Sequence, residues 1–271
     1  MARHLHSSGV LVHCHDIDPA RTAALAMLGI PIAGSAQELA RSVELLILSL
    51  PDAATVRHAL SGIGQALRPG SIIVDTSTSD PTVTRDLARE AGDLGQYFLD
   101  APVSGGPAAA STGRMTMLVG GDAAVLERAR PVLERLAAKI VHVGGSGAGH
   151  AAKIVNNMLC AANLVLVAEG LRLAEAAGIA PEGLLDGVNA GSGRSGVSEV
   201  NFPRWILSGT FDSGFTMGLM RKDVRLALGL AESLGIELPG FSPIARVWSE
   251  SAGHLADGED FNAIAAPRKP A

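Results

Sequence analysis

Short apolar runs alternate with amphipathic segments along the first 148 residues of the chain. The clearest run is Val43 to Leu50, which is nearly all apolar and ends at Pro51, as is typical of a strand buried on both faces of a parallel sheet. The full pattern predicts strands over residues 10–15, 43–50, 71–75, 97–99, 115–119 and 140–143, and helices over residues 22–28, 53–67, 81–91 and 123–136. This alternation predicts an α/β domain built on a doubly wound parallel sheet.

The strand pattern disappears after Gly144 to Gly149, a stretch in which four of six residues are glycine. The remainder of the chain predicts helices only, over residues 150–177, 181–190, 198–208, 216–234 and 241–256. At 1.5 Å per residue the first of these helices is roughly 40 Å long, which suits a helix that runs between two domains. We therefore predict an α/β domain over residues 1–148 and an all-α domain over residues 149–271.

Asp16 directly follows the first predicted strand. In a Rossmann-like doubly wound domain, a glycine-rich turn after the first strand binds the pyrophosphate of a dinucleotide, and an acidic residue about 20 positions later binds the ribose. If Asp16 is that acidic residue, the glycine turn (Gly-x-Gly-x-x-Gly) and the first strand fall before Met1. Residues 1–9 are then the end of the first helix, with Gly9 as its C-terminal cap. The alternative is that Asp16 simply begins a turn.

Composition and charge narrow the class of protein. The 271 residues are 47% hydrophobic and carry a net charge of −5, which favours neither a nucleic-acid partner nor an anionic membrane surface. No uninterrupted apolar run reaches the roughly 20 residues of a membrane span, and the first residues lack the apolar core of a signal peptide. Cys14 and Cys160 lie far apart and form no motif, which suits a reducing compartment. We therefore expect a cytoplasmic protein.

The segment His13-Cys14-His15-Asp16 consists entirely of residue types that bind metals. On a strand, His13 and His15 share one face and Cys14 points to the other, so the three side chains cannot converge on one ion. A metal site also needs ligands from elsewhere in the chain. We therefore expect no metal. Three other histidines are assigned to surface or packing positions: His4, His6 and His150.

Lys153 and Asn157 lie one turn apart near the start of the helix predicted over residues 150–177, hence on one face of it. Oxidation of an alcohol to a carbonyl needs a base for the hydroxyl proton, and the reverse reaction needs an acid. An ordinary lysine, with a pKa near 10.4, is a poor base at neutral pH, but burial between domains lowers the pKa toward the operating pH. A protonated lysine still stabilises an alkoxide. The alternative is a solvated lysine in the first helical turn.

Two segments carry recognisable motifs. Asp100-Ala-Pro-Val-Ser104-Gly105-Gly106 and Gly147-x-Gly149-x-x-x-Lys153-x-x-x-Asn157 are similar to the substrate-binding and catalytic signatures of the β-hydroxyacid dehydrogenase family. That family includes 3-hydroxyisobutyrate dehydrogenase and tartronate semialdehyde reductase. The resemblance implies that Lys153 is catalytic and that Asn157 orients it or holds the substrate. It also implies that Ser104, Gly105 and Gly106 bind a substrate carboxylate.

Three further segments resemble the cofactor contacts of the same family. They are Leu50-Pro51 with Thr55 one helical turn beyond, the loop Asp75-Thr-Ser77-Thr78-x-x-Pro81, and the pair Lys222-Asp223. The resemblance implies that Leu50, Pro51, Thr55, Thr78 and Lys222 contact the nicotinamide cofactor. Lys222 could instead pair locally with Asp223 or Glu232. Because Asp16 would repel a 2′-phosphate and is followed by Ile17 rather than arginine, NAD is favoured over NADP.

The resemblance covers essentially the whole chain and implies an NAD-dependent oxidoreductase of the 3-hydroxyisobutyrate dehydrogenase type, acting on a small hydroxy-carboxylate. Tartronate semialdehyde (2-hydroxy-3-oxopropionate) reductase is the alternative within the same class. Association through the helical domain into a homodimer or homotetramer is also implied. The rival from another class is a non-catalytic remnant without the glycine turn that acts as a scaffold.

Overall fold

The structure, a computed structural model, describes residues 1–266 of the chain. It divides into two compact units, Met1–Lys153 and Ile154–Ala271, and the division falls within helix α8 (Ala148–Ala176). The boundary expected from the sequence lies slightly earlier, between residues 148 and 149. The difference arises because the start of α8, through His150 and Lys153, makes polar contacts with residues of the first unit.

The first unit is built on one six-stranded sheet in the described part of the chain. Its strands are β1 (Leu45–Leu48), β2 (Ile72–Asp75), β3 (Tyr97–Asp100), β4 (Val103–Ser104), β5 (Met115–Gly120) and β6 (Ala137–Gly144). The order is β1-β2-β3-β5-β4, and β6 pairs with β5. β1, β2 and β3 are parallel, and Leu48, Asp75 and Asp100 stand in register at their carboxyl ends.

The sheet is mixed, because β5 runs antiparallel to β3 and β4 and parallel to β6. The sequence pattern does not reveal β4 or the short helix α6 (Gly106–Thr112) that follows it. Parallel neighbours need a crossover of about a dozen residues or more, whereas only residues 105–114 connect β4 to β5. The short connection therefore forces β5 to reverse direction.

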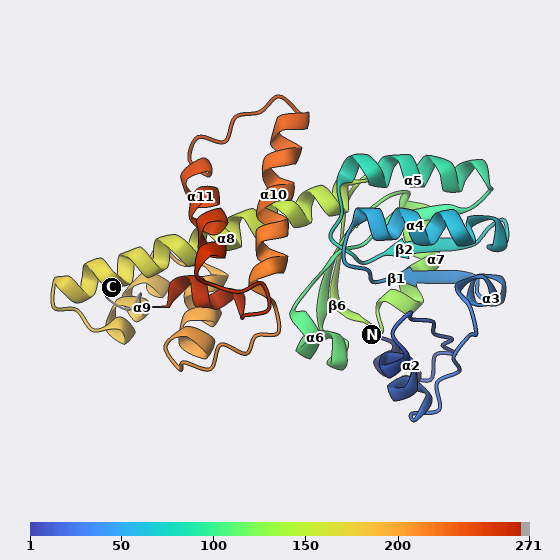
Figure 1. The fold of residues 1–271 in the computed structure, drawn as a ribbon, viewed down its shortest axis with the longest axis horizontal. Helices are drawn as coiled ribbons and strands as arrows, with labels where there is room; N and C mark the ends of the chain where they lie inside the picture. The colour runs from blue at the N-terminus through green and yellow to red at the C-terminus, as the bar shows by residue number, and fades with distance from the viewer. Residues whose placement is uncertain (267–271) are drawn as a thin grey trace. The chain divides into compact units, whose positions relative to one another are not determined.

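Helices cover both faces of this sheet. Helices α3 (Ala36–Ser42), α4 (Ala53–Ile63, extended by a 3₁₀ turn, Gly64–Ala66) and α5 (Pro81–Asp93) share one apolar cluster with Leu46, Ile73 and Phe98. Helices α1 (Ala2–Ser7) and α7 (Ala123–Leu133) share a second cluster with Val74, Leu99 and Met117. Alternate residues of each strand thus serve opposite faces. Figure 1 shows α4 and α5 side by side on one of them.

The N-terminal segment differs from the expected strand. Residues 1–9 contain a short helix, α1, which ends at Ser7, and Gly9 beyond it takes a positive φ of 78°. Residues 10–15, however, form no strand. A single bridge joins Cys14, before α2 (Pro19–Ala26), to Ile32, after it. No described strand pairs with residues 10–13, and Leu11 is 95% exposed. An apolar run alone does not make a strand without a backbone partner.

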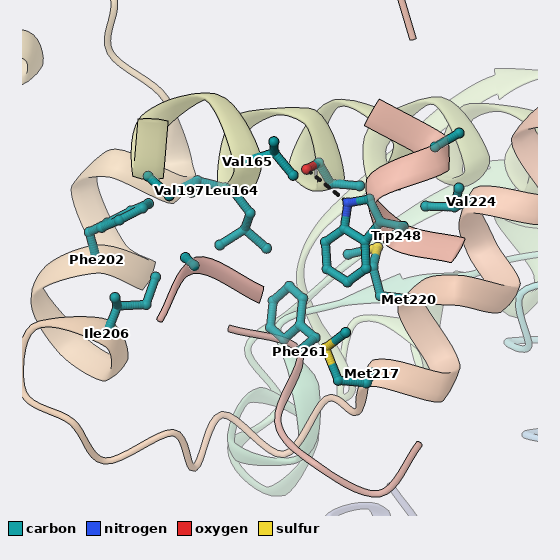
Figure 2. Packing of buried hydrophobic residues seen from close by; sticks show 14 of the residues in the cluster. Leu164, Val165, Val197, Phe202, Ile206, Met217, Met220, Val224, Trp248 and Phe261 are labelled. Carbon is teal, nitrogen blue, oxygen red and sulfur yellow. Dashed lines mark hydrogen bonds between the residues drawn. The ribbon is translucent and has the colours of Figure 1, made fainter. Parts of the chain in front are cut away.

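The regular elements of the second unit, among its described residues, are all helices, and a single bridge joins Thr216 to Asp260. After α8 come α9 (Pro181–Ala190), a π-helical segment (Val197–Ile206), α10 (Met217–Ser233), α11 (Ser242–Glu250) and two 3₁₀ turns (Ser251–Gly253 and Phe261–Ala265). Figure 2 shows their shared core around Trp248, Phe202 and Phe261. The indole N–H of Trp248 donates to the carbonyl of Ala161, 3.1 Å away, which ties α11 to α8.

Helix α8 is long and apolar enough to span a membrane by length and composition, with a mean hydropathy of 1.5. Its apolar residues have another use. Six of them are buried in the core of the second unit: Ile154, Ala161, Leu164, Val165, Ala168 and Leu171. Core packing therefore accounts for part of the apolar composition of this helix.

Candidate active site

Lys153 and Ser104 lie in direct contact in the first unit. Lys153 stands on the second turn of α8 and is only 8% exposed, so it is not a solvated helix lysine. Its ammonium donates a hydrogen bond of 2.8 Å to the hydroxyl of Ser104, at the end of β4. The residue expected to be catalytic and the residue expected to bind substrate are thus brought together by the fold.

Gly105 and Gly106 follow Ser104 and both take positive φ values, 115° and 65°. A side chain at Gly105 would place its Cβ 2.5 Å from that of Ala109, so the turn into α6 requires glycine there. Both glycines are exposed. The backbone beside Ser104 therefore stays uncovered by side chains, as a backbone carboxylate-binding site requires.

Asp100 anchors the start of α8. It is fully buried at the end of β3, and its two carboxylate oxygens each accept a main-chain hydrogen bond of 2.9 Å, one from Gly147 and one from His150. Negative charge at a helix N-terminus is favoured by the helix dipole. Burial nevertheless raises the pKa of Asp100, against the opposing influence of nearby His150 and of these two N–H groups.

Glycine is required around Asp100 because the chain packs there without room for side chains. A Cβ at Gly149 would lie 2.5 Å from the carbonyl oxygens of Asp100 and Leu118. A Cβ at Gly120 would lie 2.6 Å from the Asp100 carboxylate. The glycine-rich stretch before α8 thus allows the helix to begin directly on β3 and β5, which fixes the position of Lys153 one turn later.

His150 is a site-region residue whose importance the sequence does not reveal. It is fully buried, its Nδ1 lies 2.7 Å from the Thr84 hydroxyl on α5, and its Nε2 lies 3.8 Å from Asp75 Oδ2 at the end of β2. Sequence reasoning assigned it to packing or to the surface. A signal was available, because His150 lies one helical turn before Lys153 and so shares its side of the helix.

In the second unit, Asn157, Asp223 and Lys222 form a polar group. The Asn157 amide donates a 2.5 Å hydrogen bond to Asp223 Oδ2, and Lys222 Nζ lies 3.3 Å from Asp223 Oδ1. Asn157 and Asp223 are buried and Lys222 is half-buried. The local pairing of Lys222 with Asp223 is therefore present, while the roles of Asn157 beside the lysine and of Lys222 toward the cofactor stay predictions.

Asp16, the residue expected to bind the ribose of the cofactor, lies in a turn. Asp16 Oδ1 accepts from the backbone N–H of Asp18 at 2.9 Å, so the turn expected as its alternative role exists. Arg21 on α2 lies 3.6 Å from Asp16 and 3.4 Å from Asp18. A cation therefore lies beside Asp16, but it comes from Arg21 on α2 and not from the position after Asp16, which is Ile17.

The loops after β1 and β2 are joined at the carboxyl edge of the sheet. The N–H of Leu50 donates to the Ser77 hydroxyl at 3.0 Å, and the Thr76 hydroxyl donates to the Leu48 carbonyl at 2.6 Å. Pro51 is exposed, and Thr55 and Thr78 are half-buried. Doubly wound sheets bind their ligands outside this edge, so the loops that carry these residues fit a nicotinamide cofactor.

Two other sequence patterns, a second glycine spacing and the possible metal ligands, can also be compared with the structure. The spacing Gly191-x-Gly193-x-x-Gly196 matches a dinucleotide-binding turn, but it lies between two helices, α9 and the π-helical segment, and follows no strand. Within residues 1–266, no group of three or more histidine, cysteine, aspartate or glutamate side chains is arranged to hold a metal ion.

Comparisons with known proteins identify the family of the chain. The family model for the NAD binding domain of 6-phosphogluconate dehydrogenase matches residues 1–144. The model for the NAD-binding domain of NADP-dependent 3-hydroxyisobutyrate dehydrogenase matches residues 147–267. Together the two models span nearly the whole chain.

Individual relatives match along the same length. The 2-(hydroxymethyl)glutarate dehydrogenase of Eubacterium barkeri is 35% identical over 97% of this chain and 89% of its own. The 2-hydroxy-3-oxopropionate reductase of Escherichia coli is 33% identical over 97% of this chain and 91% of its own. The structure of Mycobacterium tuberculosis 3-hydroxyisobutyrate dehydrogenase with L-serine superposes with a TM-score of 0.91 at 34% identity, covering 97% of this chain and 92% of that one. The chain therefore belongs to the β-hydroxyacid dehydrogenase family, whose NAD-dependent oxidoreductases transfer a hydride between a small hydroxyacid and nicotinamide.

Proposed function

We propose that this enzyme acts on acids of the form HOCH₂–CH(R)–COO⁻, with 3-hydroxyisobutyrate, in which R is methyl, as its type substrate. The observation that carries the proposal is the 2.8 Å hydrogen bond from Lys153 to Ser104, because it places an acid–base group beside a substrate-binding hydroxyl. The relatives' names describe the same chemistry. 2-(Hydroxymethyl)glutarate, L-serine and reduced 2-hydroxy-3-oxopropionate differ from 3-hydroxyisobutyrate only in R.

In this proposal Lys153 handles the proton. During oxidation its neutral amine takes the hydroxyl proton of the substrate at Nζ, and during reduction its ammonium returns that proton to the alkoxide. When bound, the nicotinamide cofactor supplies or accepts the hydride. A charged Lys153 also stabilises the alkoxide by direct electrostatic attraction.

Ser104 orients both partners. Its oxygen accepts from Lys153, which leaves its own proton available for the substrate carboxylate. Gly105 and Gly106 add exposed backbone that carries no side chain of its own. The carboxylate is thus held next to the lysine, with the β-carbon alcohol within reach of Nζ.

The experiment that tests the substrate class is a panel of four acids in which R is methyl, hydroxyl, amino or carboxyethyl, assayed with NAD and with NADP. We expect the highest kcat/KM with R methyl and NAD. The corresponding alcohols, which have the same R groups but no carboxylate, should show no turnover. Equal turnover of an alcohol that lacks the carboxylate would contradict a carboxylate-binding role for Ser104–Gly106.

We also propose a cytoplasmic homodimer or homotetramer that associates through the helical unit, without a nucleic-acid or membrane partner. Support comes from α8, where four exposed apolar residues lie on one face: Val155, Leu159, Leu166 and Leu173. Light scattering of the native protein and of Leu166→Glu measures the association. A monomeric native protein would contradict the proposal.

A further inference from the structure

The His150 side chain is buried at a place where every neighbouring polar group belongs to a different element. The Thr84 hydroxyl comes from α5, and the Asp75 carboxylate comes from the end of β2. The backbone N–H of His150 itself donates to Asp100 at the end of β3. A fully buried imidazole between three elements is costly unless its nitrogens are matched to their neighbours.

Each ring nitrogen of His150 faces a different neighbour. Nε2 faces Asp75 Oδ2 at 3.8 Å and has no hydrogen-bond partner among the described residues. Nδ1 lies 2.7 Å from the Thr84 hydroxyl, which itself donates to the Asp80 carbonyl at 3.0 Å. Because a hydroxyl has only one proton to donate, the Thr84 oxygen accepts from the N–H at Nδ1. The imidazole thus joins α8 to α5 by this hydrogen bond and stands beside the end of β2.

This order of groups, carboxylate, imidazole and hydroxyl, is also that of a hydrolase triad. A nucleophile must reach its substrate, and Thr84 is only 1% exposed. The group therefore does not perform hydrolysis, and its contribution must be made through the elements that it connects.

We propose that His150 is a positioning residue that holds the first turn of α8 on α5 and β2, so that Lys153 stays on Ser104. Asp100 fixes the backbone of the same turn from the side of β3. Together the two contacts prevent the helix end from sliding or rotating. The proposal rests on the acid–base role of Lys153, because a displacement of about 1 Å at a reacting group costs about 100-fold in rate.

The substitutions that test it separate the two ends of the ring. His150→Leu removes both nitrogens, whereas His150→Asn retains an amide near the position of Nδ1 and His150→Gln reaches toward the position of Nε2. We expect His150→Leu to lower kcat about 30- to 100-fold with KM within about threefold of the native value. His150→Asn should recover most of that loss, and Thr84→Val should reproduce most of it.

A stability control excludes a general folding defect. Leu126→Ala removes packing in α7 of the same unit without changing any polar group, so its melting temperature should fall while kcat at low temperature stays native. If His150→Leu likewise had a lower melting temperature but a native kcat, His150 would be a packing residue and the proposal would be overturned.

Two further measurements need no substrate or cofactor. The ¹⁵N shifts of the His150 ring should report a proton on Nδ1, and an unprotonated Nδ1 would overturn the hydrogen bond to Thr84. Amide hydrogen exchange of residues 148–153 should quicken in His150→Leu. If Lys153→Ala kept full activity, the proposed function would fail, yet the exchange result would still show whether His150 holds the helix.

Discussion

The Lys153 ammonium donates a 2.8 Å hydrogen bond to the Ser104 hydroxyl, across 49 residues of sequence. The same short segment, from Asp100 to Ser104, controls both partners. Asp100 accepts two main-chain hydrogen bonds that fix the start of α8, and Ser104 receives the lysine that the helix carries. One stretch at the ends of β3 and β4 therefore places both the proposed substrate-binding hydroxyl and the proposed acid–base amine.

Replacement of Lys153 by alanine should lower kcat by about 100- to 10,000-fold, because the reaction loses its proton donor and acceptor. Binding of NADH, measured by calorimetry, should stay native because the change is confined to the acid–base group. Lys139→Ala, which removes an exposed lysine on β6, is the matched control and should leave kcat unchanged. Near-native turnover of Lys153→Ala would exclude the assignment.

Gly149→Ala should destabilise the first unit by about 1–3 kcal/mol, since its Cβ would meet two backbone carbonyl oxygens that cannot move aside. Gly170→Ala lies on the same helix with no atom within 4 Å of its Cβ, and it should stabilise the protein by about 0.5–1 kcal/mol. Urea unfolding of both variants gives the comparison. Equal effects would mean that the close packing on Asp100 is not real.

Asp100 makes stability depend on pH. Burial raises its pKa above the ordinary value of 3.8, so the folded protein binds this proton more tightly than the unfolded chain does. Its stabilising contribution is therefore complete below the unfolded pKa and is lost as pH rises through the folded pKa. Asp100→Asn cannot titrate, so the unfolding free energy of the native protein should fall relative to that of the variant as pH rises.

Urea unfolding of both proteins at intervals between about pH 4 and pH 7 measures this difference. The opposite result would be a native protein that gains unfolding free energy relative to Asp100→Asn as pH rises. That result would mean that the N–H groups of Gly147 and His150 outweigh burial and favour the ionised carboxylate. Because both proteins contain every other titrating group, effects from the rest of the chain cancel in the comparison.

Much of this architecture could be predicted from sequence because the informative residues are local. The apolar run ending at Pro51 predicts β1, and the loss of strand patterns after the glycines predicts the helical unit. Lys153 and Ser104 follow from motif resemblance, although their 2.8 Å contact does not. Such a contact depends on how β4 and α8 meet, and neither periodicity nor spacing reports it.

The failures have physical causes of their own. Residues 10–15 have a strand's composition, but a strand also needs a neighbour to pair with, and composition does not contain that information. β4 and α6 are too short to show any period. The environment of His150 is set by α5 and β2, more than 60 residues away, so its burial could not be read from its own segment.

Asn157 and Asp223 should be strongly coupled in stability. Each is buried, and removal of either one leaves a polar partner without its hydrogen bond. A double-mutant cycle with Asn157→Ala and Asp223→Ala should give a coupling of about 1–3 kcal/mol. The exposed pair Glu169 and Arg172, on α8 of the same unit, is the control and should give less than about 1 kcal/mol. Similar values for both pairs would mean that the buried contact contributes nothing special.

Asp16 and Arg21 together should decide between NAD and NADP. Arg21 lies 3.6 Å from Asp16. The Asp16 carboxylate offsets the charge of Arg21 and would repel a 2′-phosphate. Asp16→Ser should therefore shift the ratio of kcat/KM values toward NADP, both by removing the repulsion and by freeing Arg21 to bind the phosphate.

The double variant Asp16→Ser with Arg21→Ala separates these two causes. If Arg21 binds the phosphate, the double variant should lose most of the increase in kcat/KM with NADP that Asp16→Ser produces. Its kcat/KM with NAD should stay the same. If repulsion alone mattered, both variants should use NADP equally well. An unchanged cofactor ratio in Asp16→Ser would show that Asp16 serves only the turn that its hydrogen bond to Asp18 already forms.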